Sequence, residues 1–187
     1  MTRYYIFMSK SVRIQLLLER LARVAAAEDW SADVNPAQFA ALSYLDRANR
    51  FSRSPSQVAD YLSATRGTVS QTLKALARKG LVEERRSAAD KRSISYNVTP
   101  EGSAVLSSRS ALSDAVDQLG FKQTTALEEG LAKLDERAIK ARGDRAFGLC
   151  RTCRHHRGGD DTDRFCSLLN LPLEEREAEQ ICAEHAY

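Results

Sequence analysis

The chain has 187 residues, 43% of them hydrophobic and 28% charged, which is typical of a globular protein with one domain and an appendage, or with two small domains. The longest apolar run near the N-terminus, residues 14–18, is too short and too polar for a membrane span or a signal peptide, so we expect a cytoplasmic protein without a membrane partner. The net charge of +3 conceals a basic middle segment, because residues 50–92 contain ten Lys/Arg and only four Asp/Glu. This excess of positive charge favours a polyanion as partner, and a solvated charged surface is the alternative.

The first part of the chain carries three helix patterns in succession. Apolar residues recur at helical spacing from Ser9 to Glu28, which predicts a first long helix. The segments 35–38 (Asn-Pro-Ala-Gln) and 54–57 (Ser-Pro-Ser-Gln) each combine an N-cap residue, a proline at the first helical position and a glutamine that can reach back to the cap. We therefore expect a second helix after Asn35 and a short third helix after Ser54.

A fourth helix is predicted over residues 65–79, with Thr65 as its N-cap and Gly80 as the left-handed residue that ends it. Only residues 63 and 64 separate this helix from the third one, so the pair forms a helix-turn-helix. Its inward-facing apolar residues are Val69, Leu73 and Leu76.

The period of the pattern then changes from helical to alternating. Residues 82–86 and 93–99 are predicted strands, and the polar loop 87–92 joins them into a hairpin. Residues 99–101 begin a helix whose apolar stripe continues to Leu119, and Thr125 with Glu128 forms a capping box for a last long helix.

The helical pattern breaks at Arg142-Gly143-Asp144, where we place a domain boundary. We expect one domain over residues 1–143 and a cysteine-rich tail over residues 144–187. With six Arg and nine Asp/Glu, the tail is acidic, so it is not expected to hold DNA itself.

The order of these elements resembles the multiple antibiotic resistance regulator (MarR) family. Residues 57–62 are similar to the first helix of the family's helix-turn-helix, and residues 68–82 to its recognition helix and the exit into the wing. Asp90-Lys91-Arg92 stands where the family has an Asp-x-Arg motif in the wing, and residues 99–102 are similar to its strand-to-helix junction. The resemblance covers residues 9–143, about three quarters of the chain.

The resemblance implies a mainly α fold with a small β wing, in which the first helix and the last two interlock into a homodimer. It also implies a transcriptional regulator, not an enzyme, that binds palindromic double-stranded DNA. Members of the family usually respond to a small ligand held between the dimer helices and the DNA-binding lobe, and nothing in this sequence names such a ligand.

The free face of the predicted recognition helix carries short hydrogen-bonding side chains and two cations, which suit base edges and phosphates in a major groove. By resemblance, Arg92 enters the minor groove and Asp90 orients it. The alternatives are a solvated helix decorated with Arg66 and Gln71, and a hairpin ion pair between Asp90 and Arg92. The expected DNA-binding residues are Thr65, Arg66, Thr68, Ser70, Gln71, Lys74, Arg85, Arg86, Asp90, Lys91 and Arg92.

All four cysteines and all three histidines lie in the last 38 residues, with the spacing Cys-x2-Cys-x12-Cys-x15-Cys. Such clustering in a cytosolic chain indicates a metal site before it indicates disulfides. The predicted ligands are Cys150, Cys153, Cys166 and Cys182, with His185 as a possible alternative. Pro172 is expected to open a helix over residues 173–184 that presents Cys182.

The identity of the metal stays open between two alternatives. Four thiolates suffice for an iron–sulfur cluster, [4Fe–4S] or [2Fe–2S], with no cysteine left over, and we narrowly favour this interpretation. Zinc is the alternative, held by the pairs Cys150/Cys153 and Cys182/His185, which leaves Cys166 unused.

Three functions compete on these observations. The leading hypothesis is a dimeric regulator whose DNA affinity depends on the redox or iron state of the tail. The first alternative keeps the regulator but makes the tail a structural zinc module, with a small ligand as the signal. The second alternative, a thiol oxidoreductase or zinc hydrolase, is disfavoured because no strand–helix redox scaffold surrounds Cys150 and Cys153 and no catalytic base accompanies an open metal site.

Overall fold

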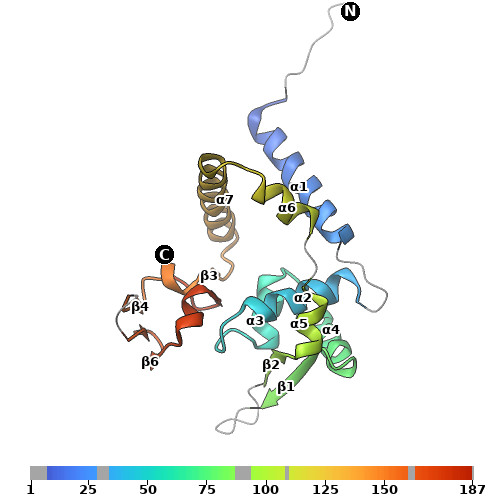
Figure 1. The fold of residues 1–187 in the computed structure, drawn as a ribbon, viewed down its shortest axis with the longest axis vertical. Helices are drawn as coiled ribbons and strands as arrows, with labels where there is room; N and C mark the ends of the chain where they lie inside the picture. Colours follow the sequence, from blue (N-terminus) through green and yellow to red (C-terminus); the bar gives the residue numbers. More distant parts are fainter. Residues whose placement is uncertain (1–7, 29–33, 87–93, 108–109, 160–162, 187) are drawn as a thin grey trace, which may run out of the picture.

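The computed structural model describes residues 8–28, 34–86, 94–107, 110–159 and 163–186. Figure 1 shows a winged helix-turn-helix lobe, three helices that extend away from it, and a small C-terminal module at its side. The structure is mainly helical with small antiparallel sheets, as the sequence predicts. The elements up to the module are α1 (Lys10–Glu28), α2 (Pro36–Arg47), α3 (Pro55–Tyr61), α4 (Arg66–Arg78), β1 (Val82–Arg86), β2 (Ile94–Val98), α5 (Pro100–Val105), α6 (Ala111–Asp117) and α7 (Phe121–Arg142).

Side-chain caps set the helix starts of the lobe, as predicted. Asn35 Oδ1 accepts a hydrogen bond from the Gln38 N–H at 2.9 Å, and Gln38 Oε1 accepts one from the Asn35 N–H at 3.4 Å. Ser54 and Gln57 form the same reciprocal pair before α3. Thr65 caps α4 by accepting from the Thr68 N–H at 3.2 Å. Each cap satisfies backbone donors that have no partner inside the helix.

One apolar core holds the lobe together. The inward face of α4 consists of Val69, Leu73 and Leu76, none of them more than 2% exposed, in a cluster with residues of α2 and α3. β1 and β2 pair antiparallel as the predicted hairpin, and Tyr96 of β2 is buried in the same core. Gly80 takes a φ of 71° between α4 and the wing, which confirms the predicted left-handed residue.

The helices α1, α6 and α7 stand away from the lobe (Figure 1), and none of their described residues is buried. Their apolar stripes therefore do not form a core within the chain. None of the described helices is long and apolar enough to cross a membrane. The large apolar side chains left exposed on these helices are Val12, Ile14, Leu16, Leu17, Leu21, Val24, Val116, Phe121, Leu127, Leu131 and Leu134.

Two helix predictions between the wing and the C-terminal module are wrong. The single helix expected to reach Leu119 is two helices, α5 and α6, because Ser110 begins a new one by accepting from the Ser113 N–H at 3.0 Å. Serine hydroxyls compete with helical backbone bonds in this way. The last helix begins at Phe121 and not near Thr125, because the Gln123 side chain accepts from the N–H of the N-cap residue, Gly120, at 3.2 Å.

The C-terminal module, residues 144–159 and 163–186, consists of short strands and two 3₁₀ helices. The strands β3 and β7 pair in one small sheet, and β4, β5 and β6 form another. The helix predicted over residues 173–184 is therefore wrong: the backbone there pairs with other segments, and the Ile181 carbonyl accepts from the Asn49 N–H at 2.9 Å. The elements are β3 (Gly148–Leu149), a 3₁₀ helix (Cys150–Thr152), β4 (His156–Arg157), β5 (Phe165–Cys166), β6 (Leu171–Pro172), a second 3₁₀ helix (Glu175–Glu179) and β7 (Ile181–Cys182).

Candidate nucleic-acid interface and cysteine module

One face of α4 is polar and open to solvent, opposite the face that packs on the core. Thr65 and Thr68 are partly committed to the cap, since their hydroxyl oxygens lie 2.8 Å apart at the start of the helix. The long side chains of Arg66, Gln71 and Lys74 are thus the ones offered to base edges and phosphates. Of the predicted residues of this face, Thr65, Arg66, Thr68, Gln71 and Lys74 are exposed and Ser70 is half-buried.

The wing strand β1 places Arg85 and Arg86 in solvent, each beside a carboxylate of its own strand. The Arg85 Nε donates to Glu83 at 2.9 Å, and the Arg86 Nε donates to Glu84 at 3.0 Å. Exposed pairs of this kind contribute little, about 0–1 kcal/mol, so a DNA phosphate can compete for either guanidinium. The remaining predicted wing residues, Asp90, Lys91 and Arg92, lie outside the described residues.

A groove of about 300 Å³ runs between α4 and the wing, with Gln71, Lys74 and Arg78 on one wall and Glu84 and Tyr96 on the other. Arg78 was not among the predicted DNA-binding residues. The signal was nevertheless present in the sequence, because Arg78 lies four residues after Lys74 and seven after Gln71, which is the spacing of one helix face.

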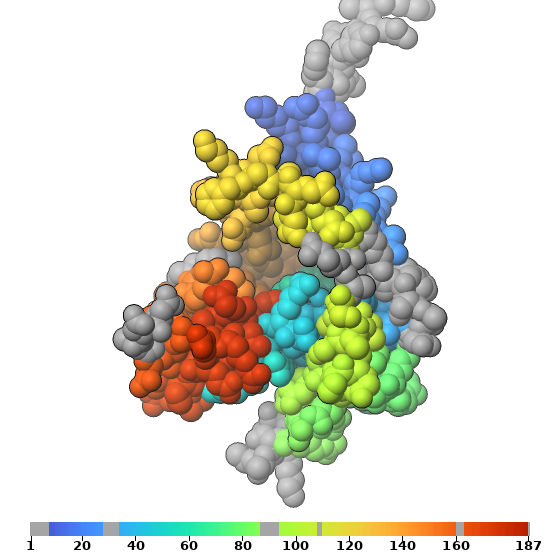
Figure 2. All heavy atoms as spheres, in the orientation of Figure 1, coloured from blue at the N-terminus to red at the C-terminus, as the bar shows by residue number. Residues whose placement is uncertain are grey.

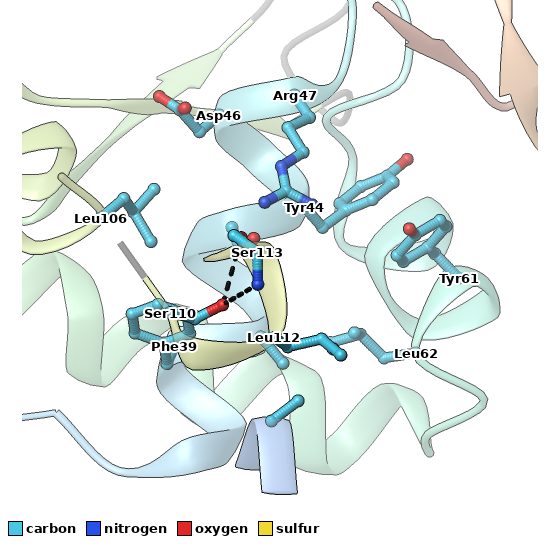
Figure 3. Close-up of a pocket in the computed structure, with 13 residues that line it drawn as sticks. Phe39, Tyr44, Asp46, Arg47, Tyr61, Leu62, Leu106, Ser110, Leu112 and Ser113 are labelled. Atoms are coloured by element: carbon cyan, nitrogen blue, oxygen red, sulfur yellow. Dashed lines mark hydrogen bonds between the residues drawn. The ribbon is translucent and has the colours of Figure 1, made fainter. Parts of the chain in front are cut away.

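A second cavity, of about 500 Å³, lies where α1 and α6 meet the lobe. Figure 3 shows its aromatic wall, in which the rings of Tyr44 and Tyr61 have centroids 4.4 Å apart. Burial, and then the neighbouring Tyr61, raise the pKa of Tyr44, whose hydroxyl donates to the Ser52 carbonyl at 2.7 Å. Leu106 and Leu112 line the cavity as well. It occupies the place where the resemblance implies a small ligand.

The four cysteines of the module are all buried and free. Each is between 5% and 9% exposed. The pKa of the Cys150 thiol is raised to about 12, mainly by burial and then by the charges of Cys182, Cys166 and Cys153. The Cys150 N–H donates to the Gln180 carbonyl at 3.0 Å, which extends the pairing of β3 with β7. The other three thiols thus influence Cys150 electrostatically, although the four residues are spread over positions 150–182 of the sequence.

Two of the sulfur atoms have polar contacts of the kind that stabilise thiolates. His156 Nδ1 lies 3.6 Å from the Cys150 Sγ, and the Ala186 N–H donates to the Cys153 Sγ at 3.4 Å. Within the described ranges, no group of three or more His, Cys, Asp or Glu side chains is arranged to hold a metal ion. The predicted metal site is not confirmed and stays a prediction.

His185, the alternative zinc ligand, is buried beside the first 3₁₀ helix of the module. Its Nε2 lies 3.0 Å from the Thr152 Oγ1. Its ring packs so closely on Gly148 that a Cβ at that position would come within 2.7 Å of it. Burial lowers the pKa of His185. These contacts give the imidazole a packing role in the module.

Comparison with known proteins supports the fold of the lobe and its helices. Residues 32–93 match the model of the MarR family, and no curated protein matches the chain. The structure of FabT from Streptococcus pneumoniae in complex with DNA is 23% identical, with a TM-score of 0.57, over 71% of this chain and 99% of that one. The S. aureus MepR–DNA complex is 22% identical, with a TM-score of 0.53, over 68% of this chain and 96% of that one.

The transcriptional regulator BldR from Sulfolobus solfataricus is 20% identical, with a TM-score of 0.55, over 70% of this chain and 99% of that one. At these identities, the likeness shows a shared winged-helix fold. The cysteine module lies outside the segment that the family model matches.

Proposed function

We propose that this protein is a MarR-type transcriptional regulator, without enzymatic activity, that binds double-stranded DNA as a homodimer. The observation that carries the proposal is α4, which packs one face on the core and offers Arg66, Gln71 and Lys74 on the other. A helix with such a face fits the major groove, where base edges differ in their donors and acceptors. The FabT and MepR structures of the same fold hold DNA, which supports this role for the lobe.

The proposed dimer uses α1, α6 and α7. Their exposed apolar side chains form a surface that a single chain leaves in water, and such surfaces mark interaction sites. A two-fold axis through these helices would place two copies of α4 on one duplex, so the dimer would read a palindrome. Asp90, Lys91 and Arg92 complete the proposed interface at the wing tip, with Arg92 in the minor groove.

We further propose that Cys150, Cys153, Cys166 and Cys182 hold an iron–sulfur cluster. The support is their joint burial, their mutual electrostatic influence and the N–H donated to Cys153. Zinc remains the alternative, but the contact of His185 with Thr152 favours an all-cysteine ligand set. A cluster would make the state of the module sensitive to iron and oxidants. Iron and sulfide in protein purified without air would support the cluster, and zinc alone would contradict it.

The cavity beside Tyr44 and Tyr61 supports a second signal, a small apolar or phenolic ligand. The aromatic residues Tyr44 and Tyr61, together with Leu106 and Leu112, line a space large enough for one compact molecule. Calorimetric titration of the protein with simple phenols tests this part of the proposal. No heat of binding with any of them would contradict it.

Selection from a random duplex library tests the DNA proposal. We expect a palindrome whose half-site centres lie about one helical turn, 10–10.5 base pairs, apart. Arg66→Ala and Gln71→Ala should relax base preference, and Arg92→Ala should weaken binding to many sequences. Arg176→Ala is the matched control, because it removes an exposed cation from the C-terminal module, away from α4 and from the proposed dimer helices. Normal binding by all three variants would show that the assigned face is wrong.

A further inference from the structure

A third cavity, of about 530 Å³, lies where α3, α7 and the C-terminal module meet. Of the described residues, only Tyr61 lines both this cavity and the one beside α1 and α6. Figure 2 shows the module, in orange and red, directly beside the cyan segment that contains α3. One wall is formed by the module, which lies outside the segment that the family model matches, so the cavity is not a feature of that segment alone.

The module wall is held in place by its contacts with the lobe. The Asn49 N–H of the α2–α3 loop donates to the Ile181 carbonyl of β7 at 2.9 Å. Leu149 pairs with Ile181 across β3 and β7, so these two cavity-lining side chains lie together. Arg50 contacts the Glu177 carboxylate, which is only 2% exposed, at 3.0 Å. Because a buried carboxylate needs its partner, this ion pair makes separation of the module from the lobe costly, and the wall is preformed.

Aromatic and aliphatic side chains line much of the cavity. Phe147, just before β3, meets Tyr61, at the end of α3, with the ring centroids 5.2 Å apart and the ring planes at 82°. Such an edge-to-face pair restrains both rings. Ile139 of α7 adds apolar surface from the third side. The space is large enough for one compact molecule, and its walls favour a molecule with apolar substituents.

The polar part of the lining is negatively charged. It includes the carboxylates of Asp60 and Asp135, and no described Lys, Arg or His lines the cavity. Asp60 contacts Arg145 at 3.3 Å, but the same guanidinium also contacts Glu184, so it neutralises only one of these two carboxylates. Within the described part of the chain, Asp135 makes no ion pair. It lies four residues before Ile139 on one face of α7, so its charge and the apolar wall border the same space.

We propose that this cavity binds a compact organic cation, such as a quaternary ammonium ion with an aromatic or aliphatic substituent. The carboxylates supply the opposite charge, and aromatic rings attract cations through their quadrupoles. An anion would face two carboxylates, and a small hydrated ion would gain nothing from the apolar wall. The cavity beside α1 and α6 differs, because its lining contains Arg47 as well as a carboxylate, Asp46. The proposal needs neither DNA nor the dimer, so it does not rest on the proposed function.

Calorimetric titration of the full chain with benzyltrimethylammonium chloride tests the site. We expect the wild type to bind one equivalent of the cation per chain. Asp135→Asn should weaken binding about fivefold or more, because the cation loses a charge partner where water screens charges less than in bulk. Asp135 is exposed on α7, so this substitution leaves the fold intact. Phe147→Leu keeps apolar bulk but removes the ring, and it should weaken binding about threefold or more.

Two controls remove a carboxylate elsewhere. Asp46→Asn acts in the cavity beside α1 and α6, and Glu129→Gln acts on α7 away from the lining; each should leave the affinity within about twofold of the wild type. No heat of binding with the wild type, or an Asp135→Asn affinity within about twofold of the wild type, overturns the proposal. If Asp46→Asn loses the probe while Asp135→Asn keeps it, the cation occupies the other cavity, which also overturns the proposal.

Discussion

Replacing Leu17 by aspartate should dissociate the proposed dimer. Leu17 lies on the apolar stripe of α1 and is 59% exposed in the single chain. Burying a whole leucine side chain contributes about 1.5–3 kcal/mol, so covering this exposed part contributes about 1–2 kcal/mol per copy. The two copies of a symmetric dimer together lose about 2–4 kcal/mol, which raises the dissociation constant about 30- to 700-fold. A desolvated carboxylate would add to the loss.

Analytical ultracentrifugation over a dilution series measures this constant directly. Leu168→Asp is the matched control, because Leu168 is 49% exposed in the C-terminal module and should leave the dimer intact. The Leu17→Asp monomer should keep its helical circular dichroism, since no described residue of α1 is part of the buried core. An unchanged dissociation constant for Leu17→Asp would refute the assignment of α1 to the dimer interface.

Three further outcomes are expected. Leu73 is fully buried under α4, so Leu73→Ala opens a cavity there and should lower the free energy of unfolding by about 2–5 kcal/mol, as measured by urea denaturation. A loss below about 1 kcal/mol would contradict the packing of α4. Arg78→Ala should weaken binding to specific and unrelated duplexes alike and should reduce the slope of log affinity against log salt concentration by about one. An unchanged slope would show that Arg78 contacts no phosphate. Burial raises the pKa of Tyr44 above its unfolded value of 10.0, so the free energy of unfolding should fall as pH rises past 10, and it should fall less steeply in Tyr44→Phe. If thermal melts show the same dependence on pH for both proteins, the buried environment of Tyr44 is contradicted.

The lobe was predictable because its signals are local. The pairs Asn35/Gln38 and Ser54/Gln57 fix their helix starts within four residues of sequence, and the structure shows each reciprocal bond. The inward face of α4 follows from helical spacing alone, and Gly80 from the need for a left-handed residue. No distant part of the chain is needed for these choices.

The C-terminal module was not predictable in the same way, because distant contacts decide its shape. Pro172 and the following residues have the pattern of a helix start, yet Ile181 pairs with Leu149 and with Asn49, far away in sequence. The single helix predicted from residue 99 to Leu119 failed for a local reason instead. Ser110 caps a new helix there and so interrupts an apolar stripe that looked continuous in the sequence. The pair of Arg50 with the buried Glu177 carboxylate, 3.0 Å apart, has no sequence signature either.

The central claim is that the exposed face of α4 reads DNA sequence. The most direct test is the ratio of affinities for the selected palindrome and for an unrelated duplex of equal length, measured by fluorescence anisotropy at one salt concentration. We expect a ratio of about 10³ or more for the wild type, falling by about fivefold or more for Gln71→Ala and for Arg66→Ala, since one base contact is worth about 1–3 kcal/mol. A wild-type ratio near one, or a ratio that neither substitution changes, would contradict the claim.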